Sequence, residues 1–174
     1  IPAFAERYDG FPADRKSLAV DCARYENAFI DIFDAKDEAP LDPQKVTSLP
    51  PEAWSTARIV LHPHLVRMRV RHAVHTLRYE LKAGASPDVA ALAVPLESPV
   101  FLALFRRDDV VHYQPLAPEA FAILEAMGRG ASLVAACEEA ARGLDPEAAA
   151  ALEPRVGAWF QEWTAAGFLI DVVA

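Results

Sequence analysis

The segment from Pro99 to Leu116 reads PVFLALFRRDDVVHYQPL, and the expected fold is built around it. Two apolar runs, Val100–Phe105 and Val110–Tyr113, flank the polar sequence Arg106–Asp109, a pattern typical of a β-hairpin with a tight turn. The first run is apolar on both faces, so we expect both faces to be covered. The second run alternates and predicts one half-exposed face. We therefore interpret the hairpin as a docking edge for another polypeptide chain.

Composition limits the classes of function. The 174 residues contain 53% hydrophobic residues and carry a net charge of −8, which disfavours non-specific binding to nucleic acid or anionic lipid. No apolar run approaches the roughly 20 residues that a membrane span needs, and no signal peptide opens the sequence. We expect a cytoplasmic protein in which Cys22 and Cys137 are buried thiols.

The sequence before the hairpin predicts helices and two short strands. Pro12–Phe33 has apolar residues at helical spacing, with Asp21 on the opposite, polar face. Arg58–Leu61 and the alternating stretch Leu65–Arg71 are strand candidates, and Ala73–Lys82 returns to helical spacing.

The sequence after the hairpin predicts three helices and a last strand. Pro118–Met127 and Leu133–Arg142 are the first two helices, and Ser132 can cap the second. In the third, Pro154 indicates a kink or a later start. We therefore predict an α+β protein, with a helical region at 1–95 that docks a partner and contains short strands within 58–71. A winged-helix-like module with a small antiparallel sheet follows at 96–174 and binds a peptide.

Catalytic patterns are weak in this sequence. The serines lack a nucleophile-elbow context and there is no glycine-rich phosphate loop, so we expect a protein that is not an enzyme. Four histidines could hold a transition metal if their rings converge, but we favour surface or interface roles and expect no metal and no cofactor in this chain. These histidines are His62, His64, His72 and His75.

A basic stretch stands out in this acidic protein. Arginines recur at alternate positions, which puts them on one face of a strand that could dock an acidic partner; they are Arg67, Arg69 and Arg71. The alternative is that they pair with the acidic segment Asp31–Asp42.

DNA binding by a winged-helix regulator is a further alternative, but residues 100–174 hold five basic and eleven acidic side chains, which disfavours contact with phosphates. A sheet edge that accepts an extended peptide suits this module better.

Four stretches also resemble a known family. They are VDCARYENAFIDIFDAKDEAPLDPQKVTSLPPEAW (20–54), RIVLHPHLVRM (58–68), LAPEAFAILEAMGRGASLVAACEEA (116–140) and WFQEWTAAGFL (159–169). Together they are similar to the C-terminal part of the HvfC/BufC proteins, in a similarity of diffuse motifs that runs from about Phe4 to Ile170. The usual Arg-Leu-Glu-Trp-Ala is replaced here by residues 24–28, RYENA. Full-length members carry a further N-terminal helical domain, so we expect this chain to correspond to short members of the MbnC type, the partner proteins of methanobactin biosynthesis.

The resemblance implies a function. Such proteins form a heterodimer with a multinuclear non-heme iron oxidase (MbnB-like), which holds the iron, and recruit a precursor peptide (MbnA-like) whose cysteines become oxazolone and thioamide groups. Their peptide-binding part resembles the winged-helix recognition element of ribosomally synthesised, post-translationally modified peptides (RiPPs), which takes a leader peptide as an added strand. We expect peptide contacts at Leu102, Leu104, Val111 and Tyr113. We expect the oxidase to contact Tyr25, Glu26, Arg67, Arg69, Arg71 and His72.

Overall fold

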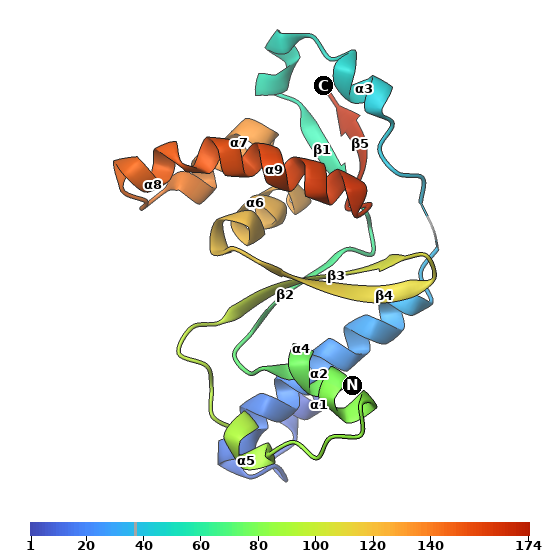
Figure 1. Ribbon diagram of the computed structural model, residues 1–174, viewed down its shortest axis with the longest axis vertical. Helices are drawn as coiled ribbons and strands as arrows, with labels where there is room; N and C mark the ends of the chain where they lie inside the picture. The colour runs from blue at the N-terminus through green and yellow to red at the C-terminus, as the bar shows by residue number, and fades with distance from the viewer. Residues whose placement is uncertain (37) are drawn as a thin grey trace. The chain divides into compact units, whose positions relative to one another are not determined.

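The computed structural model describes residues 1–36 and 38–174 and shows a mixed α+β protein (Figure 1). Its helices are α1 (Pro2–Arg7), α2 (Ala13–Phe33), α3 (Pro43–Thr47), the 3-10 helix η1 (Pro51–Ser55), α4 (Val74–Lys82), α5 (Val89–Leu92), α6 (Pro118–Gly128), α7 (Leu133–Ala141), α8 (Pro146–Ala150) and α9 (Leu152–Ala165). Its strands are β1 (Arg58–Leu61), β2 (Val66–Val70), β3 (Val100–Arg107), β4 (Val110–Leu116) and β5 (Leu169–Val173). The strand orders are β2-β3-β4 and β1-β5. The predicted hairpin and both predicted strands of the 58–71 stretch are confirmed.

The chain divides into two compact units. Unit 1 comprises Ile1–Ala35 and Met68–Pro115, and unit 2 comprises Lys36–Arg67 and Leu116–Ala174. This division differs from the predicted boundary between residues 95 and 96, because the hairpin belongs with the N-terminal helices. The physical reason is that the buried centre of β3 is covered by α2, and the last strand, β5, pairs with β1.

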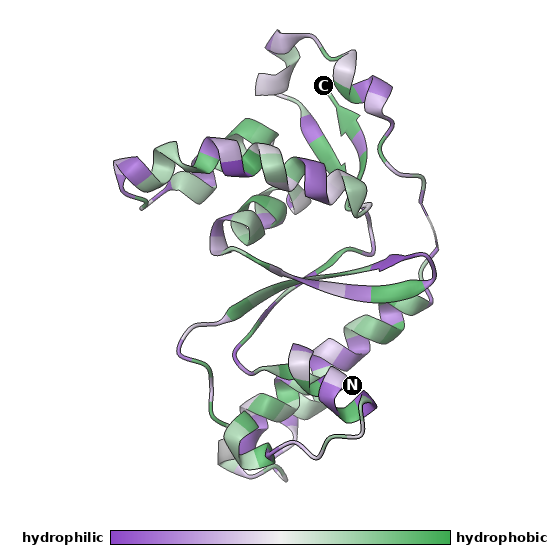
Figure 2. Ribbon diagram, in the orientation of Figure 1, coloured by the Kyte–Doolittle hydropathy of each residue, from purple (hydrophilic) through white to green (hydrophobic). Residues whose placement is uncertain are grey.

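In unit 1 the hairpin is closed by two aspartates. Asp108 and Asp109 have φ values of 51° and 58°, which are the left-handed values of a two-residue turn that matches the twist of the strands. Arg106 donates from Nη1 to the carbonyl oxygen of Phe33 at 2.7 Å, so it joins the hairpin to the C-terminal end of α2. Figure 2 shows β3 starting as a mainly hydrophobic strand and becoming hydrophilic at this turn.

A buried polar cluster joins α2 to the chain after β2. Asp21 is buried rather than on a solvent face, and its Oδ2 accepts from the backbone N–H groups of Arg71 (2.7 Å) and His72 (3.1 Å). The His72 ring is fully buried; Nδ1 donates to the Leu92 carbonyl at 3.1 Å, and Nε2 is 2.9 Å from Ser17 Oγ. The carbonyl oxygen of Leu92 can only accept, so Nδ1 is the donor of that hydrogen bond.

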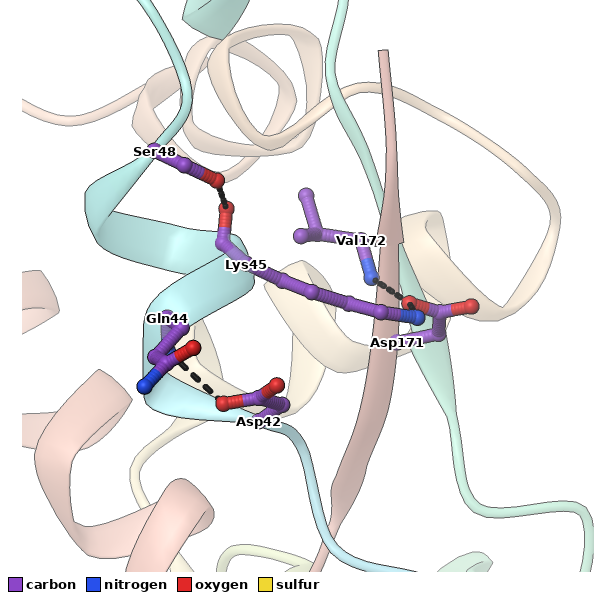
Figure 3. A network of polar contacts seen from close by, with 6 residues as sticks. All are labelled: Asp42, Gln44, Lys45, Ser48, Asp171 and Val172. Carbon is purple, nitrogen blue, oxygen red and sulfur yellow. Dashed lines mark hydrogen bonds and ion pairs between the residues drawn. The ribbon is translucent and has the colours of Figure 1, made fainter.

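Unit 2 contains the antiparallel pair β1–β5. The register runs from Arg58 opposite Val173 to Leu61 opposite Leu169, with an irregularity after Val60. Helix α3 is fastened to β5 by Lys45, whose Nζ lies 2.7 Å from Asp171 Oδ1 (Figure 3). The hydrogen bond from Lys45 is the main cause that lowers the pKa of Asp171.

The helix ends in unit 2 follow the sequence signals. Ser132 Oγ accepts from the N–H of Ala135 at 3.2 Å and caps α7, and Asp42 caps α3 by accepting from Gln44 (Figure 3). Helix α8 ends before Ala151, and α9 begins directly after that residue. Pro154 lies in the first turn of α9. Of the two readings of Pro154, the later helix start is therefore confirmed.

Candidate functional site

A cleft in unit 1 runs between the C-terminal half of α2 and strand β4. Its volume is about 220 Å³, and its walls are formed by Glu26, Phe29, Ile30 and Phe33 of α2, Arg78 of α4, and Val111 of β4. The α2 residues share one helix face because they are spaced by three and four positions. β4 ends the strand order β2-β3-β4, so its outer edge has no strand partner within the described residues.

Arg78 forms the polar wall of the cleft. Its guanidinium lies over the Phe29 ring, 4.1 Å from the ring centroid, and forms an ion pair with Glu26. The two contacts hold the guanidinium flat against α2, and its buried Nε atom has no hydrogen-bond partner within the described chain. The cleft therefore has a charged end whose charges are already paired with one another.

Aromatic side chains pack behind the polar wall, where α4 meets β4. The Tyr113 ring lies 5.5 Å from both His75 and Tyr79, measured between ring centroids. Burial lowers the pKa of His75, and its buried Nδ1 has no partner among the residues described. Tyr25 lies almost fully inside, 5.1 Å from Phe29, and its pKa is raised by burial first and then by Tyr113 and Tyr79. Burial therefore favours the neutral forms of His75 and Tyr25, which form the floor of the site.

The described walls of the cleft are mainly apolar. Ile30 and Phe33 on the α2 wall are both more than half exposed, which is unusual for large apolar side chains that line one cleft. A strand added to β4 would gain main-chain hydrogen bonds, and its alternate side chains would face the apolar wall of α2.

The predicted peptide contacts divide into two groups. Val111 lines the cleft and Tyr113 is half-buried beside it. Leu102 and Leu104 are each 0% exposed, because β3 is the central strand and α2 packs on it. Their side chains support the sheet and do not reach a bound peptide in this conformation.

The predicted oxidase contacts divide in the same way. Glu26, Arg69 and Arg71 are exposed, whereas Tyr25 and His72 are buried, so their side chains are not on the surface. Arg69 and Arg71 belong to unit 1. Arg67 belongs to unit 2, where its Nε donates to Glu125 at 2.7 Å. Arg67 and Arg69 are two positions apart in β2, and Arg71 follows the end of this strand.

Sequence reasoning missed most of the cleft. Ile30 and Phe33 lie beside the apolar face predicted for α2, and the signal that could have found them is that Phe29, Ile30 and Phe33 widen this face towards the helix end. No local sequence signal indicated Arg78, because its contact with Phe29 joins two helices that are distant in sequence.

Four histidines and two cysteines are the predicted candidates for metal and thiol chemistry. The His62 and His64 rings are 5.9 Å apart, both in unit 2, whereas His72 and His75 belong to unit 1. Within the described ranges no three His, Cys, Asp or Glu side chains form a group that could hold a metal ion. Cys22 and Cys137 are half-buried free thiols whose pKa values burial raises.

Comparison with known proteins gave no relative. No family model, curated protein or solved structure matches the chain. None of the helices described is both long and apolar enough to cross a membrane.

Proposed function

We propose that this protein is the non-catalytic partner subunit of a multinuclear non-heme iron oxidase that modifies peptides, and that it binds a precursor peptide along the outer edge of β4. The precursor belongs to the methanobactin type, in which the oxidase converts cysteines to oxazolone and thioamide groups. The chain recruits the leader part of this peptide and presents the rest to the oxidase, which holds the iron.

One observation carries the proposal. The free edge of β4 borders a cleft whose opposite wall exposes Ile30 and Phe33, and the charges at its end are already paired. Such a site selects an extended apolar segment rather than a polyanion. The family resemblance supports the same mode, with a winged-helix-like recognition element, and the proposal assigns that role to unit 1 instead of residues 96–174.

A charge placed in the cleft tests the site. Val111→Asp should weaken binding of the precursor peptide at least about tenfold, because the carboxylate must be desolvated when a peptide covers it. The matched control is Val134→Asp on α7, an exposed valine outside the cleft. Affinity is measured by calorimetry on the purified chain, with circular dichroism to verify folding. Equal weakening by both variants, or no weakening by Val111→Asp, contradicts the proposed site.

Main-chain pairing is tested on the peptide itself. In an added strand, N–H groups point alternately towards and away from β4, so N-methylation along the leader should weaken binding at every second position. Weakening at all positions, or at none, contradicts strand addition without bearing on Val111.

The oxidase contact is a separate part of the proposal. We assign it to the exposed residues Arg69 and Arg71, which suit an acidic partner surface. The double variant Arg69→Glu, Arg71→Glu should abolish co-purification with the oxidase, whereas Arg107→Glu at the hairpin turn should not. A complex that survives the double variant contradicts this interface.

A further inference from the structure

A second groove, in unit 2, follows the length of β1. It has a volume of about 470 Å³ and is lined by the consecutive residues 58–63, by Arg67, and by Gly128 and Gly130 at the end of α6. β1 pairs only with β5 among the residues described, so its other side is also a sheet edge without a strand partner. The edge begins after Ala57, whose carbonyl already accepts from the N–H of Leu133.

The guanidinium of Arg67 lies in this groove, and only one of its three nitrogen atoms forms a hydrogen bond with a described residue. Arg67 Nε donates to Glu125 at 2.7 Å, while Nη1 and Nη2 have no acceptor within the described chain. Both Nη atoms lie over Gly128, where an added Cβ would come within 2.7 Å of them. The absence of a side chain at Gly128 therefore makes room for the guanidinium. The carbonyl end of α6 also favours its positive charge.

Arg58 adds a second cation to this groove. It is exposed, and its guanidinium has no hydrogen bond or ion pair with any described residue. Two cationic side chains therefore face the groove in a unit with seven basic and thirteen acidic residues, a net charge of −6. That overall charge repels a polyanion such as nucleic acid, but single carboxylates on a polypeptide match the two arginines.

We propose that the β1 groove binds an extended acidic segment of another polypeptide as an added strand, with one carboxylate of the segment held by Nη1 and Nη2 of Arg67. The free edge of β1 supplies main-chain hydrogen bonds, and the guanidinium fork supplies the preference for a carboxylate. This site uses none of the residues of the β4 cleft, and it does not depend on the function proposed above.

The test uses two synthetic seven-residue probes. Both have capped ends and alternate Val and Thr, with Glu at the centre of one and Gln at the centre of the other. Each is titrated into the isotope-labelled full chain and followed by NMR. The Glu probe should bind roughly three- to tenfold more tightly than the Gln probe, and it should shift the amide signals of residues 58–63, Gly128 and Gly130.

Two variants separate the carboxylate contact from other effects. Arg67→Gln should make the two probes bind equally, and Gly128→Ala should reduce the preference by displacing the guanidinium while leaving Arg67 in the chain. Arg142→Gln, an exposed arginine elsewhere in unit 2, should leave the preference unchanged. The proposal is overturned by equal affinity for the two probes, by absence of binding, by a preference that survives Arg67→Gln, or by signal changes confined to the β4 cleft.

Discussion

Two of the sheet edges that have no strand partner among the described residues, at β4 and at β1, are bordered by side chains of different chemistry. β4 in unit 1 borders an apolar cleft in which the charges of Arg78 and Glu26 neutralise each other. β1 in unit 2 borders a groove in which Arg58 and the Nη atoms of Arg67 have no partner within the described residues. The backbone offers the same hydrogen bonds at both edges, so the side chains that surround an edge determine which peptide it selects.

The largest expected effect compares two leucines that are both 0% exposed, Leu102 in unit 1 and Leu169 in unit 2. Replacing either with Ala should lower the free energy of unfolding by about 2–5 kcal/mol, because each change removes buried contacts and leaves a cavity. Urea denaturation measures the loss, and hydrogen exchange shows where it falls. Protection lost mainly in the other unit would contradict the division into two cores.

The second comparison sets a buried carboxylate against an exposed one. Asp21→Ala should lower the free energy of unfolding by about 1–3 kcal/mol, because it leaves the N–H groups of Arg71 and His72 buried without an acceptor. Asp171→Ala, which removes the exposed pair with Lys45, should change the melting temperature little. Thermal denaturation of the two variants checks this order, and the reverse order would contradict it.

The third comparison concerns pH and the floor of the β4 site. Burial lowers the pKa of His75 below its usual 6.5. Below that value the unfolded chain takes up a proton that the folded chain does not, so stability falls as pH drops from about 7 to 5. His75→Gln removes this contribution and should lose less stability over the same range. Urea denaturation at both pH values measures the difference, and equal losses would contradict burial of a neutral ring.

The smallest expected effect is the response to salt. Binding of an acidic peptide at β1 should weaken a fewfold as ionic strength rises from about 0.05 to 0.5 M, because exposed charges are screened. Binding of the precursor at β4 should hold or strengthen slightly, because apolar contacts dominate there. Calorimetry with both ligands checks this contrast, and strong salt dependence at β4 would assign charge a larger role in that cleft.

Local features of the fold could be predicted from sequence. The hairpin, the strand at Arg58–Leu61 and the cap at Ser132 follow from period-two alternation, polar turn residues and capping chemistry. Each of these signals lies within about ten residues of sequence. The fold class, α+β, follows from the order of such elements.

The partition into units could not be predicted in the same way. Pairing of β1 with β5 joins Arg58 to Val173, and no local pattern specifies which of several short apolar strands become neighbours. The burial of Asp21 was missed for a related reason. Helical spacing placed it on a polar face, and only the tertiary fold brings the N–H groups of Arg71 and His72 to its carboxylate.

The candidate site was predicted in part. Val111 and Tyr113 lie at the β4 site because alternation correctly separated the two faces of that strand. Leu102 and Leu104 were assigned to the peptide because the whole hairpin was interpreted as a docking edge, although both faces of the first run were expected to be covered. The structure makes β3 the central strand, where the same apolar character serves the core.

The measurement that tests the central claim most directly is hydrogen exchange of the full chain with and without the precursor peptide. The account predicts that alternate backbone amides of Val110–Leu116 become protected when the peptide binds, because an added strand accepts hydrogen bonds from every second N–H of β4. Amides of β1 should remain unchanged unless the peptide also carries an acidic extended segment. The claim would be contradicted if the peptide binds and the amides of β4 still exchange at the rate measured without the peptide.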